Sequence, residues 1–198
     1  RDMLCVKLSH LVADAMGLLN YMEILGQLYN RLLIDPEYIP PEAPAGNRGL
    51  GQVLRVAGIP SLVKGIVNWD YPKSHWGFPP LKSDIPGLAF PVRCLCQDRT
   101  AGLKKYCHEK GVKFTDFLIT VFYQALIDIL SPSSGSRLPI QVTIDLRNLL
   151  PPGAAGTICD LTGAYYPVIR HASGKSFEQT LKEVTTAVTR AKAGQPWL

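Results

Sequence analysis

His10 and Asp14 are the two residues near the start of the chain whose types and spacing fit proton-transfer chemistry. They lie in Ser9-His-Leu-Val-Ala-Asp-Ala15, with three residues between them. An imidazole can accept and return a proton near neutral pH, while a carboxylate one turn further on fixes the local geometry. The pattern predicts His10 as a general base and Asp14 as a structural group. The same spacing of a histidine and an aspartate also occurs often by chance, and the alternative interpretation is that His10 is a purely structural residue.

The segments on either side of His10 predict how it is positioned. Residues 3–8 form an apolar, β-compatible run, and apolar residues between 16 and 33 recur at three- and four-residue steps. The first pattern predicts a strand and the second a helix. We therefore expect His10 at a strand-to-helix junction, at the mouth of a cleft.

The residues around His10 also resemble a known motif. Residues 7–17, KLSHLVADAMG, are similar to the HHxxxDG signature of the chloramphenicol acetyltransferase-like superfamily. This superfamily includes peptide-synthetase condensation domains, wax-ester synthases, alcohol acetyltransferases and the plant BAHD acyltransferases. Ser9 stands in place of the first His and Ala15 in place of the Gly, while the second His and the Asp are retained.

Two further segments follow in the order of that family. Residues 139–152, PIQVTIDLRNLLPP, resemble its V-D-x-R...P-P stretch and predict a strand over 140–146 followed by a turn. Residues 161–169 take the place of its G-N strand, with Thr162-Gly163 instead of Gly-Asn. The resemblance extends over most of the chain.

The resemblance implies direct acyl transfer from a thioester without a covalent acyl-enzyme. His10 would accept the proton of an attacking hydroxyl or amine, and protein donors would stabilise the oxyanion. Asp14 would be structural and paired with an arginine, for which Arg147 is the candidate because guanidinium suits a buried bidentate pair. A surface arginine at a turn is the alternative for Arg147. Ser9 either places a hydroxyl near the thioester or caps the local turn.

The predicted elements define an α/β fold of the chloramphenicol acetyltransferase-like type, a two-layer sandwich in which helices pack on a mixed sheet. A helix is expected at 99–110, ended by Gly111. Another is expected at 116–130, capped by Thr115 and apolar around most of its circumference. A third is expected to begin after a capping box formed by Ser176 and Gln179. Further strands are expected at 88–97 and 164–170, and a short helix within 50–67.

The prolines between residues 35 and 87 forbid long regular elements and indicate a crossover. We therefore expect residues 1–87 to end an N-terminal subdomain that carries the HxxxD motif, and residues 88–198 to begin a C-terminal subdomain. In related proteins long segments flank these motifs, so the chain is expected to be part of a larger protein and to associate with its remaining segments. The aromatic stretch 69–78 either lines a ligand channel or packs a loop onto the body.

Composition limits the function classes. The net charge is +5 and the pI is near 9.0, but basic residues are scattered, without the aromatic-interleaved run of a nucleic-acid groove. The most apolar stretch, 117–130, is too short and too often interrupted to cross a membrane. A mildly basic surface would favour coenzyme A or an acidic carrier protein. We expect no nucleic-acid partner and no membrane span.

Five cysteines, an odd number, argue against a closed disulfide framework and favour reduced thiols in the cytoplasm. Cys94 and Cys96, with Cys107-His108 downstream, are spaced too closely for a structural zinc knuckle. Core or half-buried thiols are expected instead, with no metal.

The sequence therefore predicts an acyltransferase that moves an acyl group from coenzyme A or a carrier protein to a hydroxyl or amine acceptor, with His10 as the base. No tightly bound cofactor is expected, and the acyl-CoA or phosphopantetheine thioester is a cosubstrate. The alternative is a non-catalytic, condensation-like module for binding or carrier interaction, which Ser9 and Ala15 favour slightly.

Overall fold

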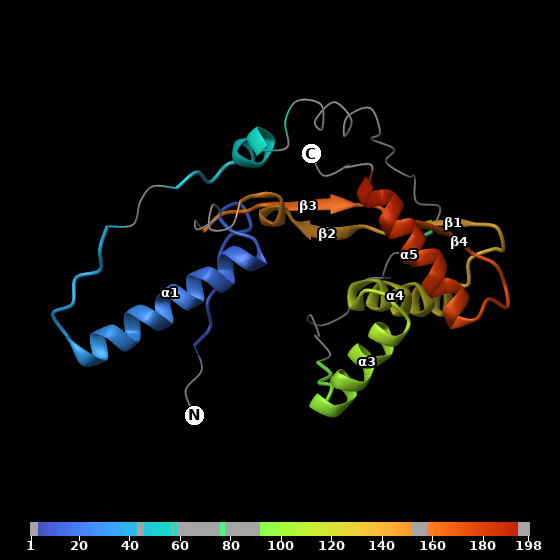
Figure 1. Cartoon of the computed structure of the whole chain (residues 1–198), viewed down its shortest axis with the longest axis horizontal. Helices are drawn as coiled ribbons and strands as arrows, with labels where there is room; N and C mark the ends of the chain where they lie inside the picture. Colours follow the sequence, from blue (N-terminus) through green and yellow to red (C-terminus); the bar gives the residue numbers. More distant parts are fainter. Residues whose placement is uncertain are drawn as a thin grey trace, which may run out of the picture. The chain divides into compact units, whose positions relative to one another are not determined.

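The computed structural model describes residues 4–42, 46–56, 58, 76–77, 92–151 and 158–193 (Figure 1). The chain divides into two compact units. The first consists of Arg1–Trp69, Thr143–Tyr165 and Gln195–Leu198, and the second of Asp70–Val142 and Tyr166–Gly194. Residues 143–165 thus join the first unit, although they follow the predicted boundary in sequence. The boundary after residue 87 lies outside the described residues and stays a prediction.

The first unit contains the long helix α1, Ala15–Ile34, which confirms the helix predicted over 16–33. Asp14 caps its N-terminus, and its carboxylate accepts a hydrogen bond from the Gly17 N–H. Strand β2, Val142–Asp145, pairs with β3, Thr162–Tyr165, and the 3-10 helix η1, Leu146–Leu149, follows β2.

A small apolar core holds these pieces of the first unit together. Val53, from a helical stretch at 51–56, packs with Leu146, Cys159 and Leu161, and all four are buried. Leu146 and Leu161 are joined further by a backbone hydrogen bond of 2.9 Å. The core therefore fixes the segment that precedes β3 against η1, and this segment supplies polar groups around Asp14.

The strand predicted over 3–8 is wrong, because residues 4–9 have no regular secondary structure. Residues 92–96, in the predicted strand 88–97, are also irregular, and residues 88–91 lie outside the described part. A strand is stabilised by a ladder of hydrogen bonds to a partner. No described segment pairs with either stretch, so their apolar composition alone does not produce a strand.

The second unit contains α3, Gln97–Glu109, α4, Phe114–Leu130, and α5, Phe177–Ala193, close to the predicted bounds. Gly111 has the positive φ of 64° that suits a glycine after a helix. The Ser176–Gln179 capping box is confirmed by reciprocal bonds of 2.8 and 3.2 Å. The predicted Thr115 cap is wrong, because α4 begins two residues earlier than predicted, at Phe114, and Lys113 occupies the N-cap.

Helix α4 packs against α5 and α3 through one face. Phe117 lies among Cys107, Leu181 and neighbouring aromatic rings. The opposite face of α4 is also apolar, as predicted, but it is not buried, and four large apolar side chains on it are exposed: Leu118, Val121, Phe122 and Ile129.

The second sheet of the molecule pairs β1, Arg137–Pro139, with β4, Val168–Arg170, in antiparallel register. Tyr123 of α4 lies buried beneath it and shares its hydroxyl between the carbonyls of Leu138 and Pro167, at 3.0 and 2.7 Å. The ring of Trp76 stacks on Tyr123, which supports the loop-packing alternative for this part of the aromatic stretch 69–78.

The predicted α/β class is confirmed, but the described residues form two two-stranded sheets in place of one mixed sheet. The strand expected over 164–170 is divided into β3 and β4 at Tyr166-Pro167, because proline has no N–H to donate to a ladder. Among the described helices, none combines the length and apolarity that a membrane crossing requires.

Candidate functional site

Asp14 is the centre of a buried polar network in the first unit. Its side chain is only 5% exposed. One carboxylate oxygen accepts the Gly17 N–H at 2.7 Å, and the other accepts Arg147 Nη1 at 2.7 Å, the Leu161 N–H at 2.9 Å and the Thr162 hydroxyl at 3.2 Å. The Asp14 carboxylate therefore ties the start of α1 to η1 and to β3.

Arg147 completes the network from η1. Besides Asp14, its Nη1 donates to Asp145 Oδ1 at 3.1 Å, and its Nη2 donates to the carbonyl of Cys159 at 2.7 Å. Its side chain is 10% exposed. The Asp14–Arg147 pair expected from the resemblance is present, and the alternative of a surface arginine does not describe this residue.

The network sets the charge states of its members. Burial by itself would raise the pKa of Asp14, but the hydrogen bonds from Arg147, Gly17 and Leu161 outweigh it and lower the pKa from 3.8 to about 2. Burial likewise opposes the charge of Arg147, whereas its bonds to Asp14 and Asp145 raise the pKa of the guanidinium. Asp14 is thus held as a carboxylate and is unsuited to accept protons near neutral pH.

Close backbone packing at the start of α1 brings the network together. A Cβ on Gly17 would lie 2.8 Å from the carbonyl oxygen of Cys159 and 2.9 Å from Cβ of Ala13, both too near for a side chain. The Asp14 N–H also bonds to this Cys159 carbonyl, at 3.4 Å. Glycine at position 17 therefore lets the first turn of α1 lie against the segment that leads into β3.

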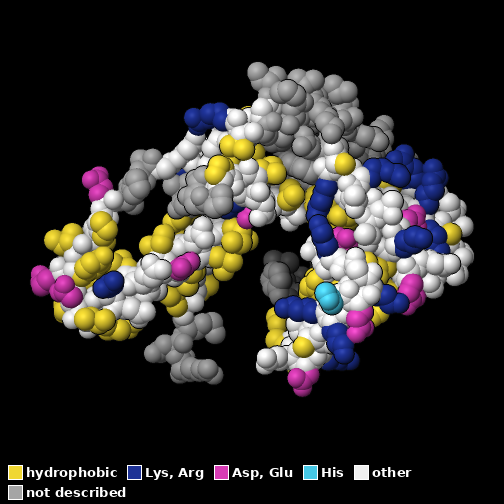
Figure 2. All heavy atoms as spheres, viewed as in Figure 1, with side chains coloured by type: hydrophobic (Ala, Val, Ile, Leu, Met, Phe, Trp, Pro, Cys, Tyr) yellow, Lys and Arg dark blue, Asp and Glu magenta, His cyan; other side chains and the backbone are white. Residues whose placement is uncertain are grey.

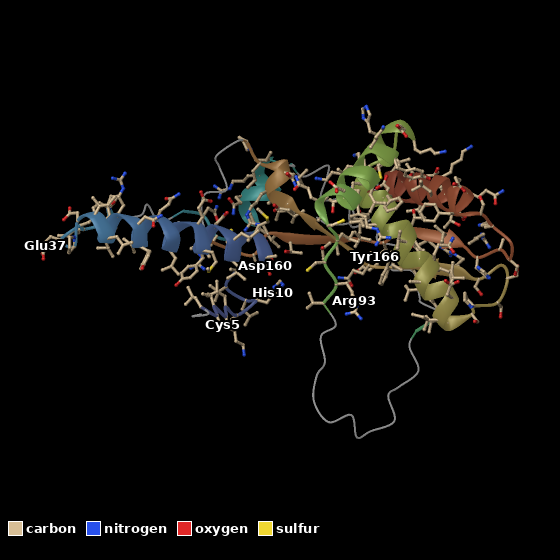
Figure 3. The ribbon with its side chains drawn as sticks, turned by 90° about the horizontal axis from the view of Figure 1, so that it is seen from below. Cys5, His10, Glu37, Arg93, Asp160 and Tyr166 are labelled. Atoms are coloured by element: carbon tan, nitrogen blue, oxygen red, sulfur yellow. The ribbon has the colours of Figure 1, made fainter. Side chains whose placement is uncertain are left out.

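His10 lies four residues before Asp14 but in a different environment. Its ring is 75% exposed, and its Nδ1 lies 3.0 Å from Oδ2 of Asp160 (Figure 3). Because an ionised carboxylate can only accept a hydrogen bond, Nδ1 carries the proton of this bond in the neutral ring. Nε2 is then the basic nitrogen, which is the arrangement that a general base requires.

Asp160 is itself held in place by its neighbours. Its other oxygen, Oδ1, accepts the N–H of Thr162 at 2.9 Å. Asp160 stands between Cys159 and Leu161, which are both in the apolar core. Sequence reasoning missed Asp160, since 149 residues separate it from His10 in the sequence and no spacing pattern links the two; its only signal is its position immediately before the Leu161-Thr162-Gly163 stretch.

Ser9 forms the turn that precedes α1. Its carbonyl accepts the N–H groups of Val12 and Ala13, at 2.9 and 3.3 Å, and its hydroxyl accepts the N–H of Leu11 at 3.4 Å. These bonds match the turn-capping alternative for Ser9. The turn presents His10 at the surface while it directs Asp14 inward.

The cysteines divide by burial, and each unit contains both exposed and buried thiols. Cys107 and Cys159 are buried, as expected for core thiols, whereas Cys94 and Cys96 are exposed, so that expectation is wrong for this pair. Both precede α3 in the irregular stretch at 92–96, which gives them no core to enter. No cluster of three potential metal ligands occurs in the described ranges.

Comparisons with known proteins identify the fold. No family model matches the sequence, and no curated protein matches it significantly. Polyketide synthase associated protein 5 from Mycobacterium tuberculosis has a similar structure, with a TM-score of 0.67 at 17% identity over 94% of this chain and 49% of that chain. The first condensation domain of the calcium-dependent antibiotic synthetase, in complex with a substrate analogue, has a TM-score of 0.64 at 19% identity over 95% of this chain and 42% of that chain.

These likenesses show that the chain has the fold of condensation domains, the chloramphenicol acetyltransferase-like fold that its motifs predict. The chain spans 49% of the first of these structures and 42% of the second.

Proposed function

We propose that the protein transfers an acyl group from a thioester to a hydroxyl or amine acceptor, with His10 as the general base. The observation that carries this proposal is the His10–Asp160 pair, in which a carboxylate 3.0 Å from Nδ1 orients an accessible imidazole. This is the division of roles found between a catalytic histidine and its orienting carboxylate in other acyl-transfer enzymes. The condensation-domain fold supports the same class of reaction.

In the proposed step, Nε2 of His10 removes the proton from the acceptor as its oxygen or nitrogen attacks the thioester carbonyl carbon. The tetrahedral intermediate collapses with cleavage of the C–S bond, and the imidazolium returns the proton to the leaving thiolate. Asp160 stabilises the imidazolium that forms between these steps. Asp14 and Arg147 do not exchange protons and hold the loop that carries His10.

The donor is proposed to be coenzyme A or the phosphopantetheine arm of a carrier protein, and the acceptor a small molecule. The condensation domains with the same fold belong to a synthetase, which favours a carrier-bound donor. The cytoplasm remains the proposed location.

The test is release of free thiol from a panel of acyl-CoA donors, with primary alcohols and amines as acceptors. We expect His10→Ala to reduce turnover by about 10² to 10⁴. Asp160→Asn should cause a smaller loss, because the imidazole remains while its favoured tautomer is no longer fixed. His108→Ala, which changes an exposed histidine on α3, is the matched control and should leave turnover unchanged.

Equal turnover of the wild type and His10→Ala, with unchanged circular dichroism, would contradict the proposed role of His10. The second candidate function is a non-catalytic carrier-interaction module, which the replacement of the first motif histidine by Ser9 favours. Absence of turnover with every donor, including acylated carrier protein, together with measurable carrier binding would support that function instead.

A further inference from the structure

The second unit carries a pocket of about 570 Å³ that is remote in sequence from the His10 motif. Its walls are the β1–β4 ladder and one face of α5, and all of its lining residues belong to the second unit. The volume falls in the usual range of small-molecule sites. Figure 2 shows Lys and Arg side chains gathered over the region where α5 meets β1 and β4.

Four cationic side chains line this pocket. Arg137 comes from β1, Arg170 from β4, and Lys182 and Arg190 from α5. Within the part of the chain that the structure describes, none of the four forms an ion pair with a carboxylate. The concave surface therefore combines several positive charges within one small volume.

The single carboxylate of the pocket, Glu183, is already engaged by other groups. Its Oε1 accepts the backbone N–H of Arg170 at 2.9 Å, and its Oε2 pairs with the ammonium of Lys175. Because Lys175 balances the charge of Glu183, this carboxylate does little to offset the four lining cations. The pocket has an excess of positive charge.

Without a bound anion, the repulsion between these four cations destabilises the fold. Arg137 and Arg170 are direct partners across the β1–β4 ladder, where like charges repel. On α5, Lys182 and Arg190 lie two turns apart on the same face, with Thr186 between them. A bound anion would offset this repulsion at all four positions.

We propose that this pocket binds a phosphate-bearing small molecule with at least two negative charges. Guanidinium groups match phosphate oxygens with paired N–H donors, and two arginines held on adjacent strands can contact one phosphate from two sides. Lys182 and Arg190 supply charge along the helix for a second phosphate or a longer ligand. The site is independent of the proposed acyl transfer and of the side chains around His10.

The experiment is isothermal titration calorimetry of the full chain with pyrophosphate, at constant ionic strength. We expect saturable binding, and we expect the double variant Arg137→Gln/Arg170→Gln to weaken it by about tenfold or more, as loss of charge-assisted hydrogen bonds predicts. The matched control is Lys104→Gln/Lys105→Gln, which removes the same charge from exposed positions of α3 and should change the affinity less than about twofold. Circular dichroism and the thermal midpoint without ligand check that both double variants are folded.

A second series of titrations distinguishes between phosphate-bearing ligands of different size. Inorganic phosphate binding as tightly as pyrophosphate would indicate a single-phosphate site, whereas tighter binding of adenosine 3′,5′-bisphosphate would indicate a nucleotide ligand; both keep the proposal. Absence of saturable binding by all three, or equal loss in both double variants, would overturn it. Binding of a polyglutamate peptide without binding of pyrophosphate would also overturn it, in favour of an acidic protein partner.

Discussion

Asp14 in the first unit and Asp116 in the second are both buried aspartates at the start of a helix, with 5% and 3% of their surface exposed. Their environments have opposite effects. The pKa of Asp14 is lowered to about 2, whereas burial raises the pKa of Asp116 against the opposing attraction of Lys192 and Lys113. Oδ1 of Asp116 has no hydrogen-bond partner among the described residues. Burial alone therefore does not determine the charge of a carboxylate, because the number of donors that face it decides the outcome.

The difference also separates structure from chemistry within the first unit. Asp14 uses its four hydrogen bonds to hold α1, η1 and β3 together, and its side chain is buried. His10, four residues earlier, has an exposed ring whose side-chain partner among the described residues is Asp160. A single turn of chain thus carries both the buried anchor Asp14 and the proposed general base His10, and changes at the two positions should affect different measurements.

The largest expected effect is that of Asp14→Ala on stability. Removal of Asp14 breaks its buried ion pair with Arg147, leaves the N–H groups of Gly17 and Leu161 without their acceptor, and costs about 3–5 kcal/mol. Urea unfolding followed by circular dichroism should therefore show a large loss in the first unit. His10→Ala should change the free energy of unfolding by less than about 0.5 kcal/mol, since the ring is exposed. Similar losses in the two variants would contradict the division between anchor and reactive group.

A smaller effect is expected from acid. Because the folded-state pKa of Asp14 is about 2 and its ordinary value is 3.8, its ionised form stabilises the fold above pH 3.8. This contribution, about 2 kcal/mol, is lost as the pH falls from 3.8 through 2. Asp14→Asn does not titrate, so the stability difference between the wild type and this variant should shrink over that interval. A difference that stays constant from pH 5 to pH 2 would show that the carboxylate is not held ionised.

The sequence predicted the parts of the site that repeat a local or family pattern. The steps of three and four apolar residues predict α1, and the V-D-x-R resemblance selects Arg147 as the partner of Asp14. Both the prediction of α1 and the choice of Arg147 depend on residue types at fixed positions within a local pattern. The Ser176–Gln179 capping box was found for the same reason, since both of its bonds are local.

The parts that were missed depend on contacts between distant segments. Asp160 faces His10 only because Leu161 and Cys159 are buried with Leu146, and no local pattern records that packing. The strand predicted over 3–8 failed for the converse reason: its residue types are suitable, but a strand also needs a partner. The Arg137 and Arg170 pairing likewise arises from the register of β1 with β4, which the sequence does not reveal.

The smallest expected effect concerns Asp116. Burial opposes the ionised form of Asp116, so Asp116→Asn, which keeps the shape and removes the charge, should raise the free energy of unfolding of the second unit at pH 7. The size of this effect depends on pH, because a raised folded-state pKa means that ionisation of Asp116 destabilises the fold only as the pH rises above the ordinary pKa of 3.8. The stabilisation by Asp116→Asn should therefore be present at pH 7 and absent near pH 3, opposite in direction to the behaviour of Asp14.

Thermal unfolding of the wild type and Asp116→Asn at both pH values measures this stabilisation. Asp98→Asn, on the exposed first turn of α3, is the control. Destabilisation by Asp116→Asn at pH 7 would mean that the attraction of Lys113 and Lys192 outweighs the cost of burial, and the contrast between the two aspartates would then be one of degree.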